Sequence, residues 1–127
     1  MHVRNLMTPA PVTISLRESI AKARGLMRTH DVRHLPVTEN GRLVGLVSER
    51  DLYLLQSLSQ EESDRQPVEE AMTESPYTVR PDDPMSSVAR EMANHKYGCA
   101  VVVDEGRIVG IVTTVDALRA LAATLTP

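Results

Sequence analysis

Apolar and polar positions follow a pattern along the chain that occurs twice. Residues 12–14 and 77–79 form short apolar runs next to a proline, as is typical of strands. Each run is followed by a segment with apolar residues at helical spacing. These residues are Ile20, Ala23 and Met27 in the first half, and Val88 and Met92 in the second. The pattern predicts a strand and then a helix in each half of the chain.

A hairpin and a second helix are predicted to complete each half. Asn40-Gly41 and Glu105-Gly106 favour tight turns, so the apolar runs on either side of each turn pair as strands. The predicted hairpin strands are 35–37 with 43–47, and 99–103 with 108–112. Second helices are predicted over about 49–58 and 114–125. Each half thus has the order β-α-β-β-α, and the fold class is α/β.

The two halves are copies of one another. At a shift of 65 residues, residues 7–53 align with 72–118 without a gap, and 13 of these 47 pairs are identical. Chance predicts identity at only about one position in fifteen to twenty. The identical pairs are Met7/Met72, Thr8/Thr73, Pro11/Pro76, Thr13/Thr78, Met27/Met92, His30/His95, Val37/Val102, Gly41/Gly106, Arg42/Arg107, Val44/Val109, Gly45/Gly110, Val47/Val112 and Asp51/Asp116.

The duplication defines the domain organisation that we expect. Repeat 1 is predicted to span 1–58 and repeat 2 to span 68–127, with the polar, mostly acidic stretch 59–67 as a surface linker. One copy is too small to bury two helices and a sheet well by itself, so the copies should pack face to face around a pseudo-two-fold axis. At the first helix of repeat 2, Asp83 is predicted to be the N-cap and Pro84 the first helical residue.

Composition and charge exclude several classes of protein. The 127 residues have a net charge of −3 and only three aromatic residues, all tyrosines, so neither a basic surface nor an aromatic platform for nucleic acid is expected. No apolar run approaches the roughly 18 residues of a membrane helix, and the amino terminus does not resemble a secretory signal. We therefore expect a cytoplasmic protein with an aliphatic core. The single cysteine, Cys99, excludes an internal disulfide.

Each copy has one motif whose residues could bind a ligand. The motif is GLVSERD in the first half and GIVTTVD in the second. Ser48 and Thr113 are predicted N-caps, where unpaired backbone N–H groups favour a phosphate. Asp51 and Asp116 lie one turn into each helix, where a carboxylate can accept hydrogen bonds from ribose hydroxyls. The same spacing also fits a simple capping box, in which the acid bonds back to the cap residue.

The duplicated pattern resembles the cystathionine-β-synthase (CBS) domain, which occurs in tandem pairs called Bateman modules. The resemblance depends on Leu35-Pro36-Val37 and on the segments 41–52 and 106–118, and it extends from about Val3 to Leu121. It implies that an adenosine nucleotide binds in the cleft between the paired repeats. It also implies a sensor rather than an enzyme, and the chain has no Ser/His/Asp or Cys/His motif that would indicate catalysis.

The resemblance places adenine against the starts of the first and second strands of each repeat. The implied nucleotide-binding residues are Thr13, Ile14, Arg33, Leu35, Pro36, Ser48, Arg50 and Asp51 in repeat 1, and Thr78, Val79, Tyr97, Gly98, Ala100, Thr113 and Asp116 in repeat 2. Ile14 and Val79 are also expected core residues. Arg33 and Arg50 are the candidate cations for phosphate, whereas repeat 2 has Gly98 and Val115 at the same places. Val101 replaces Pro36 in repeat 2.

These observations predict a stand-alone regulatory module for AMP, ADP or ATP, with S-adenosylmethionine and NAD less favoured. The module would sense cellular energy without a cofactor and would act on an unknown effector protein. We expect a homodimer, since the last helix has more apolar residues than one face needs. A structural dimerisation module with vacant pockets is one alternative. Another is a metal or redox sensor that uses His30, His34, His95 and Cys99.

Overall fold

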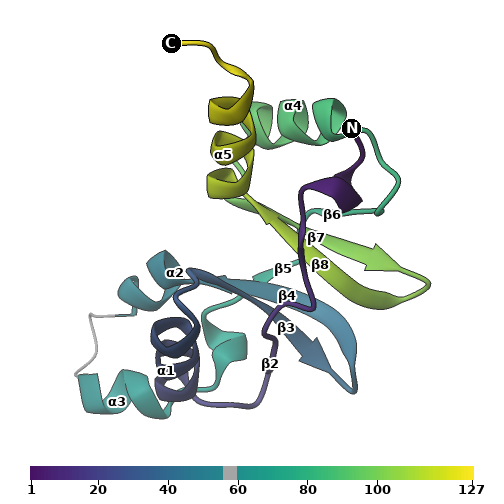
Figure 1. The fold of residues 1–127 in the computed structure, drawn as a ribbon. Coiled ribbons are helices and arrows are strands. Elements are labelled where there is room, and N and C mark those ends of the chain that lie inside the picture. The colour runs from purple at the N-terminus through teal and green to yellow at the C-terminus, as the bar shows by residue number, and fades with distance from the viewer. Residues whose placement is uncertain (56–59) are drawn as a thin grey trace. The chain divides into compact units, whose positions relative to one another are not determined.

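The chain forms two compact units that do not coincide with the two sequence repeats (Figure 1). The structure is a computed structural model that describes residues 1–55 and 60–127. One unit comprises residues 12–76 and is called the repeat-1 unit below. The other comprises residues 1–11 and 77–127 and is called the repeat-2 unit. Each unit thus includes the first residues of the other repeat, 68–76 in the repeat-1 unit and 1–11 in the repeat-2 unit.

The repeat-1 unit contains a four-stranded sheet in the order β2-β3-β4-β5. Its strands are β2 (Ile14–Ser15), β3 (His34–Glu39), β4 (Arg42–Ser48) and β5 (Thr73–Glu74). Strand β2 is parallel to β3, and the other two pairings are antiparallel. The helices are α1 (Ile20–His30), α2 (Glu49–Tyr53) and α3 (Gln60–Arg65), with a 3₁₀ turn at Val68–Glu70.

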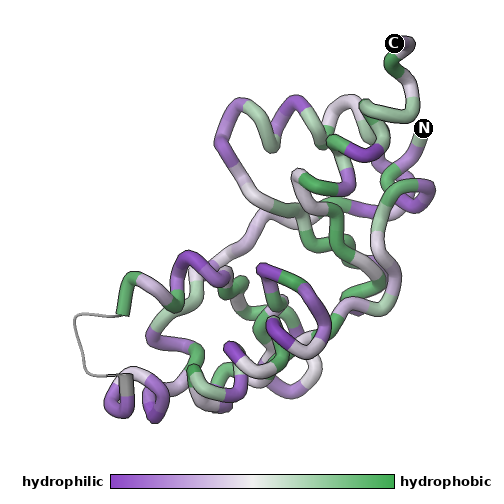
Figure 2. Tube along the Cα trace, turned by 60° about the vertical axis from the view of Figure 1, so that its left-hand side comes forward, coloured by the Kyte–Doolittle hydropathy of each residue, from purple (hydrophilic) through white to green (hydrophobic). Residues whose placement is uncertain are grey.

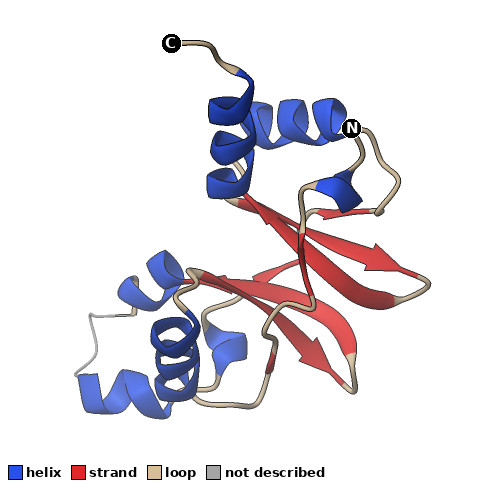
Figure 3. Ribbon diagram, viewed as in Figure 1, coloured by secondary structure: helices blue, strands red, loops and turns tan. Residues whose placement is uncertain are grey.

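The repeat-2 unit has the corresponding sheet in the order β1-β8-β7-β6. Its strands are β1 (Thr8–Pro9), β6 (Thr78–Val79), β7 (Cys99–Asp104) and β8 (Arg107–Thr113). The helices are α4 (Met85–His95) and α5 (Thr114–Thr124), and a 3₁₀ turn covers Val3–Asn5. In each unit the helices lie to one side of the sheet (Figure 3). The predicted α/β order β-α-β-β-α is confirmed in both.

The edge strands β1 and β5 were not predicted, and they explain why units and repeats differ. Thr8 pairs with Ile111 in β8, so the amino terminus completes the sheet of the second repeat. Thr73 pairs with Leu46 in β4, so the start of the second repeat completes the sheet of the first. Two-residue strands have too little pattern to be recognised by alternation in a sequence.

Both hairpins form at the predicted turns. Asn40 and Gly41 have φ angles of 51° and 79°, and Glu105 and Gly106 have 50° and 77°. Two successive residues with positive φ define the turn that matches the twist of a two-stranded hairpin. Glycine adopts this conformation without strain, which is why both copies have it at the second position.

Each unit has its own aliphatic core. In the repeat-1 unit, fully buried Ile20, Leu35, Val37 and Val47 join helix α1 to the central strands. In the repeat-2 unit, Val88 and Met92 of α4 pack with Val102 and Val112. In Figure 2, α3 is coloured as a mainly hydrophilic segment, whereas the central strands are more hydrophobic. None of the described helices has both the length and the apolar character needed to cross a membrane.

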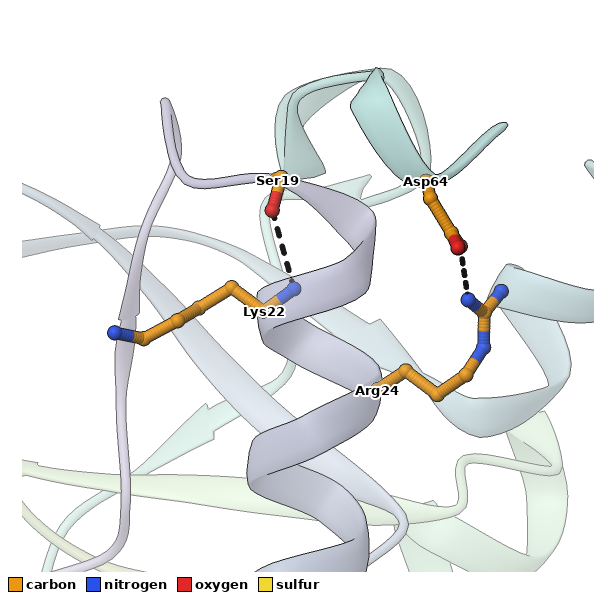
Figure 4. Close-up of polar contacts among 4 residues, drawn as sticks. All are labelled: Ser19, Lys22, Arg24 and Asp64. Atoms are coloured by element: carbon orange, nitrogen blue, oxygen red, sulfur yellow. Dashed lines mark hydrogen bonds and ion pairs between the residues drawn. The ribbon is translucent and has the colours of Figure 1, made fainter. Parts of the chain in front are cut away.

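Three local predictions need correction or limitation. Residues 60–65 of the predicted linker form helix α3, which contacts α1 through an ion pair between Arg24 and Asp64 (Figure 4). Pro84 is itself the N-cap of α4, and Asp83 instead accepts a hydrogen bond from the Arg80 amide at 2.8 Å. The second helix of repeat 1 is described only over Glu49–Tyr53, and residues 56–58 of its predicted range lie outside the described residues.

Candidate functional site

The candidate site of the repeat-1 unit begins where β4 passes into α2. Ser48 is the N-cap, and its Oγ accepts a hydrogen bond from the Asp51 amide at 3.1 Å. The Ser48 amide donates in return to Oδ2 of Asp51 at 2.8 Å. This reciprocal pair is the capping box that the sequence allowed as the simpler interpretation. It holds the Asp51 carboxylate at a fixed position beside the end of the strand.

The junction of β8 and α5 repeats this geometry in the other unit. The Thr113 amide donates to Oδ2 of Asp116 at 2.9 Å, and the Asp116 amide donates to Thr113 Oγ1 at 3.2 Å. The Thr113 hydroxyl lies 3.1 Å from the same Oδ2 and adds a third hydrogen bond. Both predicted N-caps are therefore confirmed, and both aspartates have the same role in the local backbone.

The backbone donors at the two junctions are mostly satisfied within the protein. The Glu49 amide donates to the Arg33 carbonyl at 2.8 Å, and the Thr114 amide donates to the Gly98 carbonyl at 3.1 Å. With the cap and third-position amides bonded as well, little donor capacity is left for a phosphate. Among the described residues, Oδ1 of Asp51 and Oδ1 of Asp116 receive no hydrogen bond, so each is an acceptor for a hydroxyl group.

The predicted residues on the first strands divide into buried and exposed members. Ile14 and Val79 are 3% and 5% exposed and belong to the two cores, opposite Val37 and Val102. Thr13 and Thr78 are exposed. The expectation that Ile14 and Val79 are core residues is confirmed, and a ligand beside these strands would meet the threonines.

The predicted residues on the second strands divide in the same way. Leu35, Pro36 and Ala100 are fully buried, and this burial includes their backbone atoms. Arg33 and Gly98 are exposed, and their carbonyls connect these strands to the helix junctions described above. Arg50 is also exposed, on α2, and has no ion pair or side-chain hydrogen bond among the described residues.

His34 belongs to the repeat-1 site, although the sequence analysis considered it only as a metal ligand. It lies opposite Ser48 in the β3–β4 pairing. Burial lowers the pKa of His34, Asp51 opposes this shift, and Arg33 adds to it. The equivalent residue in repeat 2 is Cys99, whose pKa is raised by burial to about 12. The sequence indicates this difference between the two sites, because His34 in repeat 1 is aligned with Cys99 in repeat 2.

The repeat-2 unit has an aromatic row near its site. The rings of Tyr77 and Tyr97 are stacked with centroids 5.1 Å apart, and His95 stacks on Tyr97 at the same distance. Burial is the largest cause that raises the pKa of Tyr77. Tyr97 is the member of the row that both other rings contact, and the residue is 39% exposed. The aligned residues of repeat 1 at the tyrosine positions are Val12 and Val32.

The metal-binding alternative has no cluster to support it in the described part of the chain. No group of three or more His, Cys, Asp and Glu side chains is placed there to hold an ion. Helix α1 ends at His30 and His34 begins β3, so these two histidines do not share a helix face, as the sequence predicted. Cys99 is buried, which keeps its thiol protonated and unreactive.

Comparison with known proteins finds relatives over most of this chain. The chain is 34% identical over 119 residues to the L-aspartate semialdehyde sulfurtransferase of Methanocaldococcus jannaschii, and the alignment covers 92% of this chain and 22% of that enzyme. The chain thus matches only about a fifth of that relative's length.

Two solved structures match nearly the whole chain. The CBS domain pair of protein MJ0100, in complex with 5′-methylthioadenosine and S-adenosyl-L-methionine, is 30% identical with a TM-score of 0.86, and 98% of each chain is covered. CBSX2 in complex with AMP is 28% identical with a TM-score of 0.86, covering 98% of this chain and 99% of that one. The family model of the CBS domain matches residues 3–56 and 68–123, and this chain therefore belongs to the CBS domain family.

Proposed function

We propose that the chain is a regulatory module that binds adenosine ligands at the Ser48–Asp51 and Thr113–Asp116 junctions. The observation that carries this proposal is the aspartate geometry, because each carboxylate is held by a capping box while its Oδ1 remains an acceptor. The similarity to CBS pairs solved with AMP, and with 5′-methylthioadenosine and S-adenosyl-L-methionine, supports the adenosine part of the proposal.

In this proposal the ribose and the base have different partners. The free oxygens of Asp51 and Asp116 accept hydrogen bonds from ribose hydroxyls. Backbone groups of Arg33 and Gly98, the exposed residues directly before β3 and β7, read the base edge, since Leu35, Pro36 and Ala100 are buried. Thr13 lies directly before β2 and Thr78 begins β6, and in the repeat-2 unit the partly exposed Tyr97 lies directly before Gly98.

The two units should differ in the phosphate they accept. Arg33 and Arg50 flank the junction of the repeat-1 unit, whereas Gly98 and Val115 occupy these positions in the other unit. Guanidinium groups favour phosphate, so AMP, ADP or ATP fits the repeat-1 site better. An uncharged nucleoside such as 5′-methylthioadenosine fits the repeat-2 site better.

We also infer that the module is not an enzyme and acts as a homodimer on a separate effector protein in the cytoplasm. Helix α5 has no buried residue, and Val115, Leu118, Leu121 and Leu125 are between 47% and 64% exposed. Exposed apolar residues gathered on one helix are typical of an association surface. A dimer without ligand affinity would support the alternative of a structural dimerisation module.

Calorimetric titration of the whole chain with adenosine, AMP, ATP and 5′-methylthioadenosine tests the proposal. Asp51→Asn should weaken AMP binding about tenfold or more, and Asp116→Asn should weaken 5′-methylthioadenosine binding similarly, because each loses a charged acceptor for ribose. Glu105→Gln changes charge by the same amount at an exposed turn and serves as the control.

Light scattering measured on the same samples separates the alternatives. If no adenosine compound binds and the chain is a dimer, the nucleotide proposal is wrong and the structural module is favoured. If binding occurs but both aspartate variants bind as the parent chain does, the ribose assignment is wrong.

A further inference from the structure

A cavity of about 370 Å³ lies within the repeat-1 unit, between the carboxyl-terminal half of α1, the turn after it, and α2. Met27, Val32 and Leu52 form its apolar floor. Its size lies within the range of roughly 300–1,000 Å³ that small-molecule sites occupy. All lining residues belong to this one unit.

Three arginines line the cavity, and within the described residues one of them, Arg24, has an ion pair. Arg24 extends from α1 toward α3 and pairs with Asp64 (Figure 4). Arg28 and Arg33 have no ion pair within the described residues, although the carboxylates of Asp31 and Glu49 line the same cavity. Two guanidinium groups are thus available to an anion that enters.

The duplication shows that the fold does not need these arginines. At a shift of 65 residues, Arg24, Arg28 and Arg33 correspond to Ala89, Ala93 and Gly98. Helix α4, like α1, has 11 residues and a left-handed cap residue after a terminal histidine, and it has no arginine in its last turn. A basic residue near a helix carboxyl terminus is favourable, but the α4 end is formed without Arg28's counterpart.

The cavity lies on a different face of α2 from the Asp51 carboxylate. Glu49, Leu52 and Tyr53 line it, and these positions share one side of the helix because they are three and four residues apart. Asp51 is two residues from Glu49 and does not line the cavity. Of the residues proposed for adenosine binding, only Arg33 lines it.

We propose that this cavity is a second ligand site, which binds a small hydroxylated phosphate monoester. Arg28 and Arg33 bind the phosphate, and their planar donor groups match its oxygens. Asp31 and Glu49 accept hydrogen bonds from hydroxyl groups of the ligand, and the floor of Met27, Val32 and Leu52 contacts its carbon skeleton. The same phosphate chemistry could come from a nucleotide bound at the Asp51 junction, so the test must separate the two sources.

Glycerol 3-phosphate is the probe, titrated calorimetrically into the whole chain. We expect Arg28→Gln to weaken its binding about tenfold or more, since charge-assisted hydrogen bonds are lost. Arg90→Gln is the matched control, because Arg90 is an exposed arginine on α4, outside the cavity. Arg28 is exposed, so its variant should fold, and an unchanged melting temperature verifies this.

The source of the phosphate is decided by Asp51→Asn. A separate site predicts that this variant retains glycerol 3-phosphate binding, whether or not adenosine compounds bind. Loss of binding in Asp51→Asn would assign the phosphate to the nucleotide site and overturn the proposal. Absence of binding at millimolar probe, or equal binding by Arg28→Gln and the parent chain, would overturn it as well.

Discussion

The two units have corresponding sheets and the same strand-to-helix junction but different side chains around their candidate sites. Ser48 with Asp51, and Thr113 with Asp116, form the same capping box at the same strand end. Around the box, the repeat-1 unit has arginines and His34, whereas the repeat-2 unit has small residues, the buried Cys99 and a row of stacked rings. The cap and the turns are common to both units, so the fold requires them. The surrounding side chains differ, so they can determine which ligand charge each site accepts.

Leu35 and its counterpart Ala100 are both fully buried but differ in side-chain size. Leu35→Ala gives repeat 1 the residue that repeat 2 already has, and we expect it to lower the free energy of unfolding by about 2–5 kcal/mol, because it leaves a cavity. Urea unfolding measures this loss. Leu54→Ala, at a site 72% exposed, should change it by less than about 0.5 kcal/mol. Equal effects of the two substitutions would show that the cores are not packed as described.

Gly45 and Gly110 test whether the two units are equivalent. A Cβ at Gly45 would lie 2.5 Å from Met72 Sδ and 3.0 Å from the Thr73 carbonyl, and one at Gly110 would lie 2.5 Å from Met7 Sδ and 3.1 Å from the Thr8 carbonyl. Overpacking at these strand contacts should cost each Gly→Ala variant about 1–3 kcal/mol of unfolding free energy.

Gly25→Ala is the control for these two variants. Gly25 lies inside α1, and a Cβ added there would meet no other part of the protein within 4 Å. The variant should raise the free energy of unfolding by about 0.5–1 kcal/mol, because alanine favours the helix. Thermal melts compare the three variants. A loss confined to one of the two strand glycines would contradict the equivalence of β1–β8 and β5–β4.

The smallest expected effect comes from His34, which repeat 2 replaces with Cys99. Burial holds the pKa of His34 below its ordinary value of 6.5, so the unfolded chain binds more protons between the folded pKa and 6.5. The contribution to stability is therefore present above pH 6.5 and is lost as the pH falls toward the folded pKa.

Urea unfolding between pH 7.5 and pH 5.5 measures this dependence. His34→Cys, which copies repeat 2, should have a smaller loss of stability over this interval than the parent chain. His30→Gln, which removes an exposed histidine at the end of α1, is measured beside it as the control for the loss of a histidine. An identical pH dependence in His34→Cys and the parent chain would mean that His34 is not buried in its neutral form.

The sequence was sufficient for the central hairpins and the caps because local chemistry decides them. Asn40-Gly41 and Glu105-Gly106 have the positive φ angles that their turns require, and Ser48 and Thr113 cap the helices as predicted. The prediction that Asp83 caps α4 was wrong, because the Asp83 carboxylate accepts a hydrogen bond from the Arg80 amide within its own turn. Helix α3 was missed because its polar sequence is typical of a linker, and its ion pair with α1 is invisible in the sequence.

The amino-acid sequence by itself determined the duplication, the β-α-β-β-α order and the motif that defines the family, because periodicity and turn residues act over a few positions. Only the tertiary structure decided that β1 joins the sheet of the second repeat and β5 the sheet of the first. Such short strands are defined by their pairing with β8 and β4. The tertiary structure also decided that Arg24, Arg28 and Arg33 line a cavity together with α2, because α1 and α2 are separated in the sequence and contact one another only in the folded unit.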